Sequence, residues 1–284
     1  MQKVSRSILS EALAGRYHHA LDGDILDLAD YDSPDLRFAD PEELEPLFAH
    51  PEISGIRHLI VAEGAEYSLA WILERLTTLD TLHLRVTEAY SNVIDKDSFR
   101  HIASSPATSH LTSIYLENTE IFGLSHLATS PLRRLKSLNL TGCLHPDSIT
   151  ALIQPAPAFY SLQELHLTPD SLTQEQAYQI GEARNFAQVE ALNIPFVMGS
   201  GFDWSPHYQN AHLVQNIPLV VEGLQRLPQL KKLRLTSPYD DDELELDPTL
   251  VEEVMRRLRA DLSVEVAGVL LDQLSVIPER IKRL

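Results

Sequence analysis

Short apolar segments with one fixed internal spacing recur along this chain, and longer segments with helical periodicity separate them. The clearest is LKSLNLTGCL, in which Leu135, Leu138 and Leu140 are followed by Cys143 and Leu144. Leu138 and Leu140 alternate with polar residues, as in a strand that buries one face. A segment this short cannot bury that face alone, so the pattern predicts neighbours of the same kind on either side.

Six further segments carry the same one, four, six spacing of apolar residues. They are Ile56-Leu59-Val61, Leu79-Leu82-Leu84, Leu111-Ile114-Leu116, Leu162-Leu165-Leu167, Val189-Leu192-Ile194 and Leu230-Leu233-Leu235. Consecutive segments start about 23 to 41 residues apart, and most steps lie within the roughly 20 to 29 residues of a leucine-rich repeat. One match alone also fits an amphipathic helix, but seven in one chain are very hard to obtain by chance.

The segment from Leu135 to Cys143 matches the start of the motif L-x-x-L-x-L-x-x-(N/C)-x-L, so the chain resembles leucine-rich repeat proteins from about Ile53 to Ala267. The resemblance implies an α/β solenoid similar to ribonuclease inhibitor, with a curved parallel β-sheet on its concave side and helices on its convex side. Strand-then-helix units that all run in one direction imply parallel pairing through right-handed crossovers. We expect a helical N-terminal cap at 1–52, an arc of about seven repeats at 53–260 with a long insertion at 196–229, and a helical C-terminal cap at 261–284.

Helix start signals stand between the apolar segments. Asp40 precedes a proline at the first helical position, and Ser68 is placed to cap a helix that runs to Leu76. Thr173 and Gln176 have the spacing of a capping box. Further helices are expected at 5–21, 97–104, 124–129, 146–154 and 247–259, an edge strand at 25–28, a last strand at 264–266 and a closing helical turn at 278–284.

Two segments break the repeat. The long insertion begins with glycines and a proline interleaved with Phe202, Trp204 and Tyr208, and loops of this length are usually functional or disordered. These aromatic residues either bind a partner or cover the irregular end of the core, because large aromatics are enriched in both places. The second segment is the acidic run YDDDELELD from Tyr239 to Asp247, whose spacing does not fit a calcium loop.

Charge and cysteine content limit the classes of partner and the cellular compartment that are expected. The formal net charge is -18, which disfavours nucleic acid and anionic lipid and favours a basic protein partner, although the same charge also keeps an open scaffold soluble. The single cysteine, the lack of a signal-peptide pattern and the lack of a long apolar run favour a cytoplasmic protein that does not enter a membrane. Because both ends are expected to be capped, we expect a monomer.

Residues that alternate with the buried leucines are predicted to form a partner-binding face on the concave sheet. The middle column runs from Ile60 to Arg234. The predicted binding residues are His83, Arg85, Tyr115, Glu117, Asn139, His166, Asn193, Lys232 and Arg234, together with Phe202, Trp204 and Tyr208 of the insertion. Aromatic and arginine side chains anchor many interfaces, although the same residues also occur as ordinary solvated strand positions.

No residue pattern favours catalysis, a metal or a cofactor. His83 and His166 belong to strands three apart, so they stand about 14 Å from one another, too far to share a metal ion. Cys143 occupies the motif position at which Asn or Cys supports the adjacent coil, so a structural thiol is expected. Hydrolase, phosphate-loop and zinc-protease motifs are absent, and the chain is not expected to be an enzyme.

The sequence therefore predicts a non-catalytic scaffold that binds a partner protein through its concave sheet. The alternative is an acidic inhibitor or immunity-type protein that masks a basic enzyme, such as a nuclease toxin, through fast and salt-sensitive association.

Overall fold

A computed structural model of the chain describes residues 21–29, 41–49, 51–62, 66–85, 93–94, 96–130, 132–168, 172–195, 217–236, 248–266 and 269–271. Within these residues nine strands pair in parallel in one sheet. They are β2 (Ile25–Asp27), β3 (His58–Ala62), β4 (Thr81–Arg85), β6 (Ser113–Ile121), β7 (Ser137–Leu144), β8 (Glu164–Leu167), β9 (Ala191–Pro195), β10 (Lys232–Thr236) and β11 (Ser263–Val266). Their order in the sheet is their order in the chain, so each strand-and-helix unit lies beside the next.

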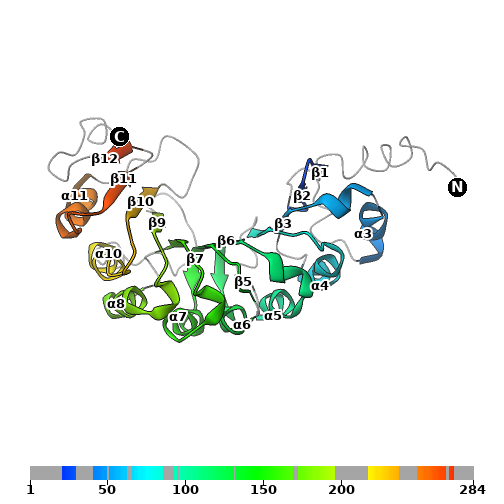
Figure 1. Cartoon of the computed structure of the whole chain (residues 1–284), viewed down its shortest axis with the longest axis horizontal. Coiled ribbons are helices and arrows are strands. Elements are labelled where there is room, and N and C mark those ends of the chain that lie inside the picture. Colours follow the sequence, from blue (N-terminus) through cyan, green and yellow to red (C-terminus); the bar gives the residue numbers. More distant parts are fainter. Residues whose placement is uncertain are drawn as a thin grey trace, which may run out of the picture.

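Helices alternate with these strands and lie on one side of the sheet. They are α3 (Pro41–Phe48), α4 (Glu66–Arg75), α5 (Lys96–Ser104), α6 (Leu124–Thr129), α7 (Pro146–Ile153), α8 (Gln174–Glu182), α10 (Ile217–Leu224) and α11 (Pro248–Arg257). Figure 1 shows the units following one another along an arc, with the helices on its outer side. The described part of the chain is thus a parallel α/β fold with a solenoid-like arrangement. We term the sheet face opposite the helices the front face.

The core is a continuous stripe of aliphatic side chains between the sheet and the helices. One row of it runs across the sheet in register and comprises Leu26, Leu59, Leu82, Ile114, Leu138, Leu165, Leu192, Leu233 and Val264. Each of these residues is at most 1% exposed. Along each strand the apolar residues therefore face this core, and the residues between them face the front, as predicted.

Paired backbone hydrogen bonds join each unit to the next just before the strand. The N–H groups of Asp80 and Thr81 both donate to the carbonyl of Arg57, at 2.8 and 2.9 Å. The same arrangement recurs between later units, where two consecutive N–H groups donate to one carbonyl. The donors and their acceptors are Thr112 and Ser113 to Asp80, Lys136 and Ser137 to Thr112, Gln163 and Glu164 to Lys136, Glu190 and Ala191 to Gln163, and Lys231 and Lys232 to Glu190. This recurrence shows that the units repeat in backbone geometry as well as in apolar spacing.

Most of the predicted elements agree with the structure within a few residues. Helix α6 has the predicted bounds, and α3 begins at the predicted Pro41. The capping box of α8 is complete, because the hydroxyl of Thr173 accepts from the N–H of Gln176 at 3.2 Å and the Gln176 side chain accepts from the N–H of Thr173 at 2.8 Å. The predicted cap at Ser68 is wrong, since α4 begins at Glu66 and Ser68 is buried within it.

An antiparallel strand pair lies at each end of the sheet. At one end β1 (Leu21–Asp22) pairs antiparallel with β2 through a turn at Gly23, whose φ of 62° suits glycine. At the other end β12 (Val269–Leu271) pairs antiparallel with β11, so this part of the C-terminal segment is a strand pair. The helix predicted at 5–21 lies outside the described residues except for Leu21, which belongs to β1, and the helical turn predicted at 278–284 lies wholly outside them. Another short strand, β5 (Val93–Ile94), pairs with the end of β6.

The long insertion contains an ordinary unit of the repeat. Helix α10 lies within the range predicted as insertion, and its residues Val220, Val221 and Leu224 are fully buried in the common core. Residues 217–224, inside the range predicted as an insertion, thus supply the helix that the repeat requires at this place. The sequence obscured this helix because its apolar residues are nearly continuous and show no clear period.

Candidate functional site

The front face carries one continuous row of side chains across all the parallel strands. The register places Asp27, Ile60, His83, Tyr115, Asn139, His166, Asn193, Arg234 and Glu265 side by side in this order. The part from Ile60 to Arg234 is the column that the sequence predicted, and this register is confirmed. We term these residues the middle row and treat them as the candidate binding site.

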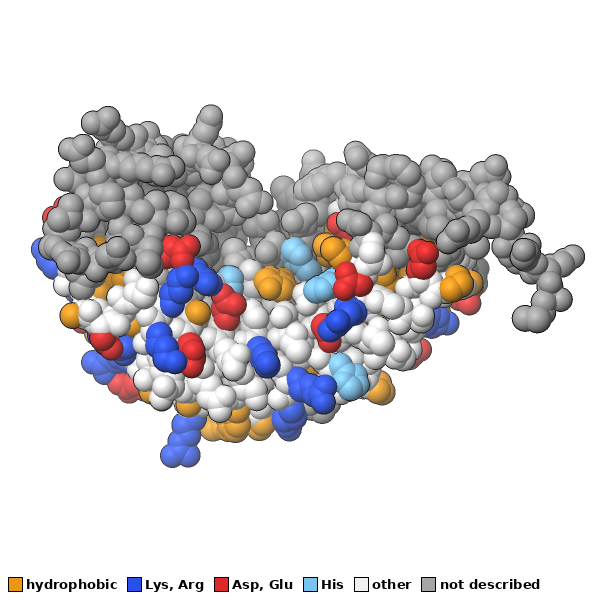
Figure 2. Space-filling view, turned by 45° about the horizontal axis from the view of Figure 1, so that its top comes forward, with side chains coloured by type: hydrophobic (Ala, Val, Ile, Leu, Met, Phe, Trp, Pro, Cys, Tyr) orange, Lys and Arg blue, Asp and Glu red, His pale blue; other side chains and the backbone are white. Residues whose placement is uncertain are grey.

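After Asp27, the half of the middle row nearer the N-terminus is apolar and aromatic. Ile60, His83 and Tyr115 are partly exposed. The rings of His83 and Tyr115 are tilted by 52°, with their centroids 5.7 Å apart, within the range over which aromatic rings attract one another. Figure 2 shows hydrophobic and histidine side chains next to one another on the surface of this part of the molecule. This half offers an apolar area for a partner to cover.

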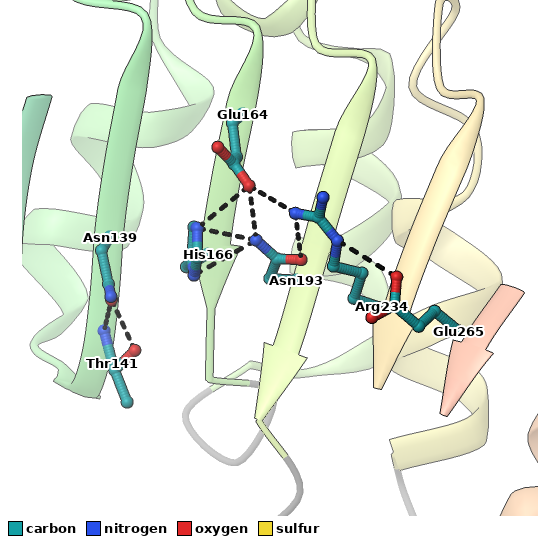
Figure 3. A network of polar contacts seen from close by, with 7 residues as sticks. All are labelled: Asn139, Thr141, Glu164, His166, Asn193, Arg234 and Glu265. Atoms are coloured by element: carbon teal, nitrogen blue, oxygen red, sulfur yellow. Dashed lines mark hydrogen bonds and ion pairs between the residues drawn. The ribbon is translucent and has the colours of Figure 1, made fainter. Parts of the chain in front are cut away.

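Asn139, at the centre of the middle row, forms its side-chain hydrogen bonds within its own strand. Its side chain is only 6% exposed, and its Oδ1 accepts from the backbone N–H of Thr141 at 2.9 Å and from the Thr141 hydroxyl at 2.5 Å (Figure 3). These two bonds occupy the amide oxygen. Asn139 therefore holds the end of β7 in shape, and its predicted role in binding stays a prediction.

A polar network occupies the front face of β8, β9 and β10 (Figure 3). Glu164 Oε1 accepts from Asn193 Nδ2 at 2.9 Å and from Arg234 Nη1 at 2.7 Å. Asn193 is only 3% exposed, and its Oδ1 accepts from Arg234 Nη1 at 3.3 Å. Arg234 thus reaches across β9 to a carboxylate two strands away, and the buried amide of Asn193 supports both partners from below.

Two further charges extend this network onto β11. Glu265 Oε2 lies 2.6 Å from Lys232 Nζ and 3.5 Å from Arg234 Nε. The pKa of Glu265 is lowered, chiefly by its bond to Lys232. With Glu164, the cluster contains two carboxylates and two bases. The front face is therefore close to electrically balanced here, although the whole chain is strongly acidic.

His166 contacts both Asn193 and Glu164 within this network. Its Nε2 lies 2.7 Å from Asn193 Nδ2 and 3.4 Å from Glu164 Oε1. An amide nitrogen only donates, so a neutral His166 accepts at Nε2 and carries its hydrogen on Nδ1. The same Nε2 atom thus lies between the Asn193 amide and the Glu164 carboxylate.

The same contacts hold Glu164 ionised to very low pH. The hydrogen bond from His166 lowers its pKa most, and the Asn193 amide and the charges of His166 and Arg234 lower it further. These effects outweigh burial, which raises it, so the pKa of Glu164 falls from 4.5 to about 2. The carboxylate is thus a fixed negative charge of the site at every physiological pH.

Acid titration of Glu164 provides a test of this network. A lowered pKa in the folded state stabilises the fold fully above pH 4.5, and this stabilisation is lost as the pH falls from 4.5 to about 2. We expect Glu164→Gln to be less stable than wild type at neutral pH, with the difference shrinking across that window. Urea unfolding at a series of pH values measures it. Glu74→Gln, at an exposed residue of α4, is the control, and an equal pH response in both variants would contradict the network.

Several predicted binding residues are placed only in part. Arg85 and Glu117 occupy paired front-face positions of β4 and β6, and their side chains lie outside the described residues. Phe202, Trp204 and Tyr208 lie wholly outside the described residues, as does the acidic run at 239–247. Cys143 pairs with Glu120 through the backbone of β7, and its predicted structural role is untested.

Sequence reasoning missed Glu265 as a member of the site. The alternation of Val264 and Val266 predicted a strand, but Glu265, which lies between them, was not included in the predicted site. Lys232 and Arg234 flank Leu233 on the neighbouring strand, and Glu265 pairs in register with Arg234. An acid opposite two bases was the signal that could have found it.

Histidines elsewhere on the front face are separated as predicted. The strand order places β4 and β8 three strands apart, so His83 and His166 are not neighbours. Within the described ranges, no group of three His, Cys, Asp or Glu side chains is arranged to hold a metal ion. No described helix is both long and apolar enough to cross a membrane.

Comparison with known proteins adds no assignment: no protein-family model matches the chain, and no curated protein matches it. The class of the protein is therefore given by its own architecture, a parallel α/β sheet whose strand-and-helix units repeat.

Proposed function

We propose that this chain is a leucine-rich repeat protein that serves as a non-catalytic scaffold and binds a partner protein on the front face of its sheet. In this proposal the front face is the concave side of a solenoid, the aromatic residues of the insertion add contacts, and the protein acts as a monomer in the cytoplasm. Support for the family comes from seven matching apolar segments and from the recurring backbone bonds between units.

The observation that carries the proposal is that the middle row divides, after Asp27, into two parts. An apolar and aromatic half at Ile60, His83 and Tyr115 is followed by a polar half in which Asn193 and Arg234 are held by hydrogen bonds. Interfaces commonly combine an apolar centre with a polar rim. Side chains fixed before binding lose little entropy when a partner docks, which favours affinity.

A second candidate is the acidic inhibitor or immunity-type protein that masks a basic enzyme such as a nuclease toxin. The net charge of -18 favours it, as does the sequence from Leu21 to Ile56, where Arg37 is the only Lys or Arg among many acids. The balanced charges at β8 to β11 do not contribute to such an attraction. Binding that collapses between low and moderate salt would support this candidate, and salt-insensitive binding would support the scaffold.

Affinity capture from a native lysate, read by mass spectrometry, tests the scaffold proposal. Wild type is compared with His83→Ala/Tyr115→Ala, which removes the ring pair from the front face. The matched control, His126→Ala/Tyr178→Ala, removes the same residue types from helices α6 and α8 on the other side of the sheet. Circular dichroism establishes that all three proteins are folded.

We expect one protein to be retained by wild type and control and lost from the front-face variant. Its purified form should then bind that variant about tenfold or more weakly, as expected for anchor residues. Equal retention by both variants would move the site away from the front face. Conversion of a captured small molecule by wild type would overturn the non-catalytic assignment.

A further inference from the structure

A second row of charged residues lies along the edge of the sheet where the strands begin, and most of its charges are paired. Arg57 forms an ion pair with Asp80 of the next unit, and Lys231 Nζ lies 2.8 Å from Glu190 Oε1 of the preceding one. Between these pairs stand Thr112, Lys136 and Gln163, joined to one another through the recurring backbone bonds. Lys136 is therefore a base between two neutral neighbours, where the rest of the row places an acid beside each base.

Two more bases precede Lys136 in the chain, and an aromatic residue belongs to the adjoining unit. Arg133 and Arg134 are exposed, and Arg134 Nη1 lies 3.5 Å from His110 Nδ1 of the preceding unit. Tyr160 belongs to the following unit, next to Ser161, whose hydroxyl donates to the carbonyl of Arg133 at 3.1 Å. We term His110, Arg133, Arg134, Lys136 and Tyr160 the basic patch.

The basic patch has no acidic partner within the described part of the chain. Arg133 Nη1 donates to the carbonyl of Ser130 at 2.9 Å and Arg134 contacts a histidine, but none of the three bases forms an ion pair there. In Figure 2 basic side chains lie along the lower edge of the molecule, one of them beside a histidine, with uncharged surface between them. In a chain with a net charge of -18, this cluster is a local reversal of sign.

Tyr160 gives the basic patch an apolar component. It is 41% exposed, and it is the one exposed large hydrophobic side chain among the described residues. Tyrosine and arginine are enriched at the energetic centres of interfaces. Exposed bases without partners attract carboxylates most strongly when an apolar contact also removes water from the pair.

We propose that the basic patch is a second binding surface, separate from the front face, and that it binds a short acidic segment of a partner protein with an apolar residue against Tyr160. The positive charges of the basic patch favour a negatively charged ligand. The patch spans only the three units that lead into β6, β7 and β8, which suits a short segment.

The remainder of the molecule argues for an acidic protein segment and against nucleic acid. Nucleic acid carries a continuous line of phosphates and gains affinity from many of them at once. A strand of it extending beyond the patch would meet the acidic residues that give the chain its net charge. A protein segment ends its acidic stretch after a few residues and avoids this repulsion.

A displayed library of random peptides, selected on the full-length protein, tests the proposal. The variant Arg133→Gln/Arg134→Gln/Lys136→Gln removes the charges of the basic patch. The control, Arg100→Gln/Lys231→Gln/Arg256→Gln, removes the same number of exposed positive charges elsewhere, so both variants repel acidic peptides equally at long range. A single-stranded oligonucleotide serves as the nucleic-acid probe.

We expect peptides rich in Asp and Glu with an apolar or aromatic residue to be enriched on wild type. Their affinity should fall about tenfold or more in the patch variant and change little in the control, and Tyr160→Ala should weaken them by a smaller factor. Failure to enrich acidic peptides, or equal losses in both charge variants, would overturn the proposal. Oligonucleotide binding that depends on the patch and exceeds peptide binding would overturn the assignment to a protein partner.

Discussion

Leu138→Asp is expected to unfold the described domain, whereas Asn139→Asp, one residue away, is expected to leave it folded. Leu138 is fully buried and pairs in register with Ile114 and Leu165, at the middle of the core stripe. The substitution removes about 1.5 to 3 kcal/mol of apolar burial and adds the larger cost of an unpaired charge in the core. Native proteins are stable by only about 5 to 15 kcal/mol, so this loss is enough to abolish the fold.

The architecture adds to this effect. Each unit packs mainly on its neighbours, so the stability of the array depends on the interfaces between adjacent units. A charge at Leu138 disturbs both interfaces of the central unit at once. Far-ultraviolet circular dichroism during urea titration measures the loss, and we expect no cooperative transition in Leu138→Asp.

Asn139→Asp is a sharp control because it places the same side chain on the other face of the same strand. An aspartate at 139 retains the oxygen that accepts from the N–H and hydroxyl of Thr141. Its urea transition should stay close to that of wild type. If Leu138→Asp unfolded with a wild-type transition, or if both variants lost the fold, the assignment of the two faces would be wrong.

This register could be predicted from the sequence because the alternation of strand side chains leaves little choice. A slip of one residue would move Leu138 and Leu140 to the front face and bury Asn139 in the core. Seven segments with the same spacing each require their apolar residues to be buried on one face. Adjacent strands therefore align so that these residues form one buried stripe. The helices were predictable where a cap or a proline marks their start, as at Thr173 and Pro41.

The polar network could not be predicted in the same way. Its contacts depend on how far Arg234 reaches across β9 and on the burial of Asn193, and neither is a property of local period. Glu164 and Arg234 are 70 residues apart in the chain. The sequence placed Arg234 on the front face, but side-chain conformation across three strands decides which residues it contacts.

The close contact between helices α8 and α10 is another feature that has no sequence period, and it makes Gly223→Ala the second substitution with a large expected effect. A Cβ on Gly223 would lie 2.7 Å from the backbone N of Tyr178 and 2.8 Å from the backbone C of Ala177. These are backbone atoms, so α10 must move away from α8 to make room. The neighbouring hydrogen bond from the Tyr178 hydroxyl to Glu222, 3.0 Å long, would be strained by the same movement.

Gly223→Ala is expected to destabilise the fold by about 1 to 3 kcal/mol, the usual cost of overpacking a close contact. Helix propensity acts in the opposite direction, because alanine is favoured over glycine by about 0.8 to 1.0 kcal/mol within a helix. A net loss therefore means that the contact, and not the backbone entropy of the helix, decides the outcome. The shift of the urea midpoint at constant slope measures it.

Gly55→Ala is the control that distinguishes the α8–α10 contact at Gly223 from the general effect of replacing a glycine by alanine. A Cβ on Gly55 would meet nothing within 4 Å, and Gly55 does not need a positive φ. The alanine there should be neutral or stabilise by up to about 1 kcal/mol, because it restricts the unfolded chain. Opposite shifts for Gly55→Ala and Gly223→Ala would therefore locate the constraint between α8 and α10, whereas a stabilising Gly223→Ala would show that the two helices lie further apart than described.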